Sequence, residues 1–186
     1  KFDATSVTTT WTQHATLDAL CFAKNGKHLF RAQTTNLVCK VDTNADPWTA
    51  ANWGAAAQFR VGDASSAIVK MRVHPDGTLF ILKTDGVYVL LEDGSDVQLY
   101  AGTKFTPNGD NGLYSYLFEN WIHVTYAGSH YRIAPGGAIQ PIGPERLSEN
   151  DTDVRGYITA GVGTPWGAVA AIYNPTTART GIFWGK

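Results

Sequence analysis

Short apolar runs alternate with turn residues along most of this chain. Residues 74–94, HPDGTLFILKTDGVYVLLEDG, show the pattern most clearly, because three Asp-Gly pairs separate the apolar runs. Asp-Gly is typical of tight hairpin turns, since both central positions of the favoured turns need positive φ. The run TLFILK (78–83) is apolar on both faces, which is typical of a strand buried on both sides. The pattern therefore predicts antiparallel hairpins with a middle strand packed between neighbouring sheets.

The same order of runs and turns occurs four times. Tight turns at residues 25, 76, 119 and 164 each lie between two apolar runs, and they recur about every 45 residues. Each copy continues with a second turn and a third apolar run, and the first three copies close with a fourth, more polar run. The units cover about 14–62, 63–102, 109–143 and 154–186. The first is the longest, because residues 48–58 insert a loop whose alanines allow one helical turn.

The two ends of the chain suggest how the units are closed. Residues 8–13 (TTTWTQ) resemble a fourth run that has no first three runs before it, and the chain ends after a third run. We expect residues 8–13 to complete the last unit and to close a ring without an open edge. The alternative is a larger ring whose other units lie outside these residues. Because the sequence begins with Lys1 and not with Met, we expect it to be either processed or part of a longer chain, and we favour the longer chain.

Four-stranded units of about 45 residues are the signature of a β-propeller. We therefore predict an all-β fold, a β-propeller of four-stranded antiparallel blades, with residues 1–186 as a single domain. The repeat pattern resembles propeller modules of tailed-phage virion proteins. It also resembles, more weakly, propeller lectins of the tachylectin type, through Asn52-Trp53 in a loop and the turn Pro75-Asp76-Gly77. These resemblances imply contacts with neighbouring protein subunits or with a surface glycan.

Charge and hydropathy exclude two classes of partner. The net charge is −1 and no basic cluster is visible, whereas a nucleic-acid-binding protein normally shows a basic patch. No stretch approaches the roughly 18 apolar residues of a membrane span, and the first residues lack the apolar core of a signal peptide. We expect neither nucleic-acid binding nor membrane insertion.

Candidate catalytic and metal-binding residues have simpler explanations. Asp76, Asp85, Asp93 and Asp96 all fall at turns, where aspartate hydrogen-bonds the local backbone. The histidines lack metal-ligand spacing. His123 and His130 flank one hairpin, and we interpret them as polar residues on a half-exposed strand. Residues 148–156 resemble a fragment of a calcium loop without its closing glutamate, so a loop between blades is favoured. We predict no catalytic residue, no metal and no cofactor.

Two residue types need a separate interpretation. Cys21 and Cys39 are best explained as small buried apolar residues, with a disulfide between neighbouring strands as the alternative. Trp121, Trp166 and Trp184 lie in or beside repeat strands, where we expect them to pack between blades. The remaining candidates are in the long loop, because binding residues concentrate on loops of rigid scaffolds. We predict partner contacts at Trp48, Asn52 and Trp53.

The favoured function is a non-catalytic structural or binding module of a larger assembly. The resemblance to tailed-phage proteins implies a tail or capsid appendage, located on a virion or outside the cell, that contacts protein subunits or a host-surface glycan. The alternative is a carbohydrate-binding propeller lectin. A glycoside hydrolase is less favoured, since it needs two acids about one pocket, for example among Glu145, Asp151 and Asp153.

Overall fold

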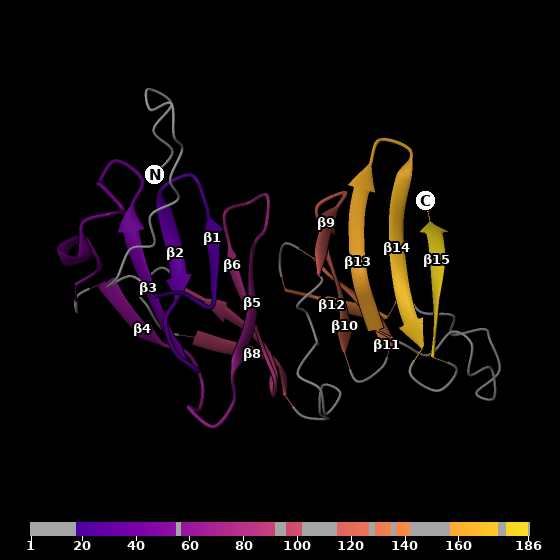
Figure 1. Cartoon of the computed structure of the whole chain (residues 1–186), viewed down its shortest axis with the longest axis horizontal. Coiled ribbons are helices and arrows are strands. Elements are labelled where there is room, and N and C mark those ends of the chain that lie inside the picture. Colours follow the sequence, from indigo (N-terminus) through magenta and orange to yellow (C-terminus); the bar gives the residue numbers. More distant parts are fainter. Residues whose placement is uncertain are drawn as a thin grey trace, which may run out of the picture.

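The computed structural model describes residues 18–54, 57–91, 96–101, 115–126, 129–134, 137–141, 157–174 and 178–185. Within these residues the chain forms four antiparallel sheets, which follow one another in chain order along the longest axis of the molecule (Figure 1). The helical structure in this part is one short 3-10 helix, η1 (Ala50–Trp53). The predicted all-β class is confirmed.

Each sheet is a meander in which consecutive strands are hydrogen-bonded neighbours. The first sheet holds β1 (Cys21–Lys24), β2 (His28–Ala32), β3 (Leu37–Asp42) and β4 (Gln58–Arg60). The second holds β5 (Ile68–Val73), β6 (Leu79–Lys83), β7 (Gly86–Leu90) and β8 (Asp96–Ala101). The third holds β9 (Tyr116–Phe118), β10 (Trp121–Tyr126), β11 (Ser129–Ile133) and β12 (Ile139–Pro141). The fourth, within the described residues, holds β13 (Tyr157–Thr164), β14 (Gly167–Asn174) and β15 (Arg179–Gly185).

The strands fall where the apolar runs predict them. All five residues of β6 are buried, which confirms a middle strand covered on both faces. Residues 8–13 lie outside the described part of the chain, so closure by that segment stays a prediction. The first and last sheets lie at opposite ends of the molecule in Figure 1.

The hairpin turns are where the sequence places them. Glu119 and Asn120 have the positive φ predicted for both central positions, +46° and +63°, but the turns at Asp76-Gly77 and Asn25-Gly26 differ from the prediction. Gly77 has φ +92°, whereas the Asp76 before it does not have positive φ. The carboxylate of Asp76 accepts a hydrogen bond from the Thr78 amide at 2.8 Å. Asn25 acts in the same way toward the amides of Lys27 and His28. The polar side chain therefore stabilises these turns by bonding the backbone, a common use of Asn and Asp in turns.

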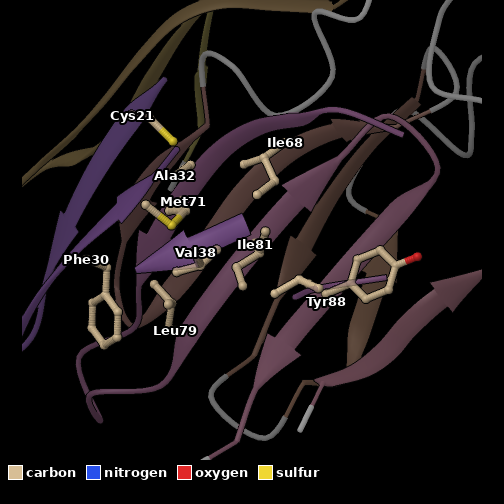
Figure 2. Close-up of a cluster of buried hydrophobic side chains, with 10 residues drawn as sticks. Cys21, Phe30, Ala32, Val38, Ile68, Met71, Leu79, Ile81 and Tyr88 are labelled. Atoms are coloured by element: carbon tan, nitrogen blue, oxygen red, sulfur yellow. The ribbon is translucent and has the colours of Figure 1, made fainter. Parts of the chain in front are cut away.

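Apolar side chains join each sheet to the next. The first two sheets share a cluster in which residues of β1–β3 meet residues of β5–β7, shown in Figure 2. A second cluster joins β6 and β7 to β10 and β11 through Phe80, Leu82, Val87, Val89, Ile122, Val124 and Ile133. A third joins β9 to β14. Burying one large aliphatic or aromatic side chain contributes about 1.5–3 kcal/mol, so each sheet depends on its neighbour for stability.

A polar contact also links the second and third sheets. The Nε of Arg72 donates to the Ser115 hydroxyl at 2.8 Å, and the guanidinium also donates to the Ser115 carbonyl oxygen. Burial lowers the pKa of Arg72. Because the charged group is satisfied by hydrogen bonds, its burial between the sheets is tolerated.

Both cysteines are free and buried, which confirms their interpretation as small apolar residues. The strand register explains why they do not meet. Cys21 lies opposite Ala32, and Cys39 lies opposite Arg31, the neighbour of Ala32. Adjacent residues of a strand point to opposite faces. Cys21 consequently joins the cluster of Figure 2, and Cys39 lies on the other side of the sheet.

Candidate functional site

The insertion between β3 and β4 covers part of the outward face of the first sheet. Trp53 is only 3% exposed and lies in an apolar cluster with Cys39 and Val41. Its indole Nε1 donates to the Pro47 carbonyl oxygen at 2.9 Å. The guanidinium of Arg31 lies 4.9 Å from the centre of its ring. These contacts give Trp53 a packing role in the insertion.

Trp48 and Asn52 lie on the outer side of the same insertion. The Trp48 ring is 47% exposed. The Asp46 carboxylate accepts hydrogen bonds from the Trp48 amide and the Thr49 hydroxyl, at 3.0 and 2.9 Å. The side-chain amide of Asn52 donates to the Asp46 carbonyl oxygen at 2.8 Å. The insertion is thus internally bonded and presents one aromatic ring to solvent. A contact role for Trp48, Asn52 and Trp53 stays a prediction.

The fourth sheet has one face turned away from the other sheets, and that face is apolar. The register aligns Val162, Val169 and Trp184 across the three strands, and it aligns Ala171 with Ile182 in the next row. Val162, Ile182 and Trp184 are 56%, 79% and 63% exposed. We call this surface, formed by Val162, Val169, Ala171, Ile182 and Trp184, the end face. A large exposed apolar patch commonly marks an interaction site.

The end face corrects the prediction for two tryptophans. Trp166 is 74% exposed at the turn between β13 and β14, and Trp184 is exposed on the end face. Neither ring shows the burial expected of packing between blades. The opposite face of the sheet carries the buried Ala168, Ala170 and Ile172 instead, and the ring of Tyr116 lies against Gly161 there.

A groove of about 610 Å³ opens between the first and second sheets. The first sheet contributes Phe30, Lys40 and Phe59, and the second contributes Leu79 and Leu90. One end is formed by the two turns that hold Asn25 and Gly77, which are joined by a 3.2 Å hydrogen bond from the Asn25 side-chain amide to the Gly77 carbonyl oxygen.

Sequence reasoning did not identify this groove, because its residues come from strands that are far apart in the chain. Alternation along β2, β3 and β4 shows which side chains share a face, but it does not show where two sheets diverge. The available signal in the sequence was that Lys40 shares one face of the first sheet with Phe30 and Phe59, which is unusual for a face that only packs against a neighbouring sheet.

The candidate catalytic residues are used structurally where the structure describes them. The Asp85 carboxylate accepts a hydrogen bond from the Tyr88 hydroxyl at 2.9 Å. His123 is buried and stacks on Tyr116, with ring centres 4.7 Å apart. The interpretation of His123 as a half-exposed polar residue is therefore wrong. Glu145, Asp151 and Asp153 lie outside the described residues, as does the segment that resembles a calcium loop.

Within the part of the chain that the structure describes, no cluster of three or more His, Cys, Asp or Glu side chains could bind a metal ion. The same residues contain no helix with the length and apolar character needed to cross a membrane.

Comparison with known proteins identifies the fold and no family. No family model matches the chain, and no curated protein matches it. Solved structures do match. A streptogramin B lyase structure superposes with a TM-score of 0.58 at 8% identity, over 89% of this chain and 54% of that one. The WD40 domain of Neurospora crassa Pan2 gives a TM-score of 0.51 at 12% identity, over 89% of this chain and 49% of that one.

A third match is PorZ, a surface component of the type-IX secretion system of Porphyromonas gingivalis. It gives a TM-score of 0.58 at 10% identity, over 90% of this chain and 21% of that one. WD40 domains are β-propellers, so these matches support a propeller-type fold. At such low identity they show the fold alone. The chain spans about half the length of the lyase structure.

Proposed function

We propose that this protein is a non-catalytic structural and binding module of a larger assembly. The end face is the observation that carries the proposal, because it combines exposed Val162, Ile182 and Trp184 and contains no charged residue. Depletion of charge and enrichment in aromatic side chains distinguish the centre of an interface from ordinary surface. In this proposal the end face contacts a neighbouring copy of the chain.

The resemblance of the repeats to propeller modules of tailed-phage virion proteins extends the proposal to a tail or capsid appendage, where many copies occupy symmetric positions.

The test is the oligomeric state, measured by light scattering over a range of protein concentrations. We expect the protein to self-associate and Ile182→Lys to shift the equilibrium to monomers, because a charge would be buried in the interface. Ala51→Lys, an exposed position in η1 on the first sheet, is the matched control and should leave association unchanged. A protein that stays monomeric at every concentration, or one whose association is the same in Ile182→Lys, contradicts the proposal.

A second candidate function, glycan binding, is favoured by Trp48. Its exposed ring stands beside the bonded Asp46 and Asn52, and aromatic rings flanked by polar groups suit sugars. A glycan array provides the test. We expect Trp48→Ala to lose the signal and Trp166→Ala, which removes a comparably exposed ring elsewhere, to retain it. Absence of binding by the unmodified protein would remove this candidate.

A further inference from the structure

The groove between the first two sheets has the size of a small-molecule site. Its volume of about 610 Å³ lies within the roughly 300–1,000 Å³ typical of such sites. Phe30 and Leu79 belong both to its lining and to the apolar cluster of Figure 2. The groove is therefore a continuation of the apolar space between the two sheets, at the place where their side chains no longer meet.

One wall of the groove is aromatic. The register places Phe30 opposite Lys40, and it places Val38, two residues before Lys40, opposite Phe59. Phe30, Lys40 and Phe59 consequently project from the same face of the first sheet. Leu79 and Leu90 of the second sheet line the facing wall. Two phenyl rings facing two leucines suit a flat apolar molecule.

A positive charge lies against this apolar wall. The Nζ of Lys40 is 4.9 Å from the centre of the Phe59 ring, and no carboxylate pairs with it among the described residues. The contact with the ring is a cation–π interaction, which holds the ammonium at the groove. Lys27 and His28 also line the groove. A cation that lies beside apolar rings, with no carboxylate partner among the described residues, favours an anionic group on the molecule that binds there.

The acidic groups near the groove are already engaged. Asp76 is the carboxylate in the lining, and it accepts a hydrogen bond from the Thr78 amide and lies 3.5 Å from the Nδ1 of His74. Asp42 lies opposite His28 in the register, and its carboxylate accepts a hydrogen bond from the Asn44 amide at 2.7 Å. Neither contact neutralises Lys40.

The end wall is fixed before any ligand arrives. Asn25 bonds the amides of Lys27 and His28 through its carbonyl oxygen and the Gly77 carbonyl through its amide. One side chain thus holds the turn of the first sheet against the turn of the second. A site that needs no reordering on binding retains more of its interaction energy as affinity.

We propose that this groove binds a small aromatic carboxylate. In this site the aromatic body lies between Phe30 and Phe59 on one side and Leu79 and Leu90 on the other, and the carboxylate accepts hydrogen bonds from Lys40. The groove shares no residue with the end face or with Trp48, so this inference stands independently of the proposed function.

The experiment is a titration of the whole chain with 2-naphthoate, followed by backbone amide chemical shifts. Gly26 and Gly77, which line the groove, are the reporters. The neutral probe 2-naphthylmethanol has the same ring system without the charge. We expect saturable shifts at both glycines and tighter binding of the carboxylate. Lys40→Met keeps most of the apolar stem of the side chain. We expect it to weaken the affinity for 2-naphthoate about tenfold or more and to leave the affinity for 2-naphthylmethanol unchanged.

Lys24→Met is the matched control, because Lys24 is an exposed lysine on β1 that does not line the groove. It should bind both probes as the unmodified protein does. Equal affinity for the two probes, or an unchanged affinity for 2-naphthoate in Lys40→Met, would contradict the proposal that Lys40 binds the carboxylate. The absence of chemical-shift changes at Gly26 and Gly77 up to millimolar probe concentrations would contradict the proposal that the groove is a binding site. Thermal unfolding of each variant verifies that the fold is retained.

Discussion

The ammonium of Lys83 lies 2.7 Å from the carbonyl oxygen of Val61, although the lysine side chain is fully buried. The same Nζ donates to the Asp63 carbonyl oxygen at 2.6 Å and lies 5.4 Å from the centre of the Tyr88 ring. Val61 and Asp63 belong to the connection between the first two sheets. Lys83 therefore fixes this connection against the second sheet, and it satisfies the buried Val61 carbonyl, whereas the Asp63 carbonyl also accepts a hydrogen bond from the Ser66 amide at 3.4 Å.

Replacing Lys83 with methionine should destabilise the fold. Methionine fills a similar volume but donates no hydrogen bond, so the carbonyl groups of Val61 and Asp63 lose a donor. An unsatisfied buried group costs about 1–3 kcal/mol, and we expect Lys83→Met to lower the free energy of unfolding by about 2 kcal/mol. Urea denaturation measures this change. Lys24→Met, at an exposed lysine, should stay within about 0.5 kcal/mol of the unmodified protein. An equal or higher stability of Lys83→Met would show that the apolar replacement compensates for the lost bonds.

Trp53 should matter for stability far more than Trp48, although both lie in one insertion. Trp53→Ala removes a buried ring from the outward face of the first sheet and leaves a cavity. Such losses cost about 3–5 kcal/mol for large aromatic residues. Trp48→Ala removes a ring that is 47% exposed and should cost less than about 1 kcal/mol. Thermal unfolding of the two variants compares them directly, and similar melting temperatures would contradict the packing role of Trp53.

The two thiols should react slowly with alkylating agents in the folded protein. Burial raises the pKa of both Cys21 and Cys39, so less of each is present as the reactive thiolate at pH 8. Their contribution to stability is fully present below the pKa of an unfolded thiol and declines as the pH rises above it.

Iodoacetamide labelling followed by mass spectrometry measures both rates. We expect Trp53→Ala to accelerate the labelling of Cys39, which Trp53 covers, and to leave Cys21 protected in the cluster of Figure 2. Equal acceleration at both cysteines would indicate that the variant unfolds as a whole and that Trp53 does not cover Cys39 specifically.

The strands were predictable from the sequence because each one obeys a local rule. The run IVKMRV coincides with β5 and HLFRA with β2, since apolar runs bounded by Asn-Gly or Asp-Gly leave few other structures. The buried middle strand β6 was predictable for the same reason. The conformation of the turns was less predictable, because the Asp76 and Asn25 side chains select among several turns of similar energy.

The candidate surfaces depend on contacts that no local rule describes. Trp53 looked like a loop residue available for binding, but an apolar ring beside an uncovered sheet face is buried by folding back onto it. Trp184 looked like a packing residue, yet it lies on the face of the last sheet that points away from Tyr116. Lys40 and Phe59 form part of a groove only because two sheets diverge there.

Two glycines should respond to alanine in opposite directions. A Cβ at Gly161 would overlap the Tyr116 ring, which belongs to the cluster between the third and fourth sheets. Because the ring has little room to move, we expect Gly161→Ala to lower the free energy of unfolding by about 1–3 kcal/mol, as overpacked cores do. A Cβ at Gly26 would meet nothing within 4 Å, and the backbone there is not left-handed. Gly26→Ala should therefore leave stability unchanged or raise it by up to about 1 kcal/mol, because alanine restricts the unfolded chain.

A double-mutant cycle tests whether Gly161→Ala lowers the free energy of unfolding through overlap with the Tyr116 ring or through a general effect of alanine in a strand. Tyr116→Leu shortens the side chain that approaches Gly161, so the double variant Gly161→Ala with Tyr116→Leu should be more stable than the sum of the two single effects predicts. Residues in direct contact show such coupling, typically about 0.5–3 kcal/mol. Chemical denaturation of the four proteins gives the coupling energy. If the two effects simply add, then the Tyr116 ring does not rest on Gly161, and the contact between the third and fourth sheets has to be sought elsewhere.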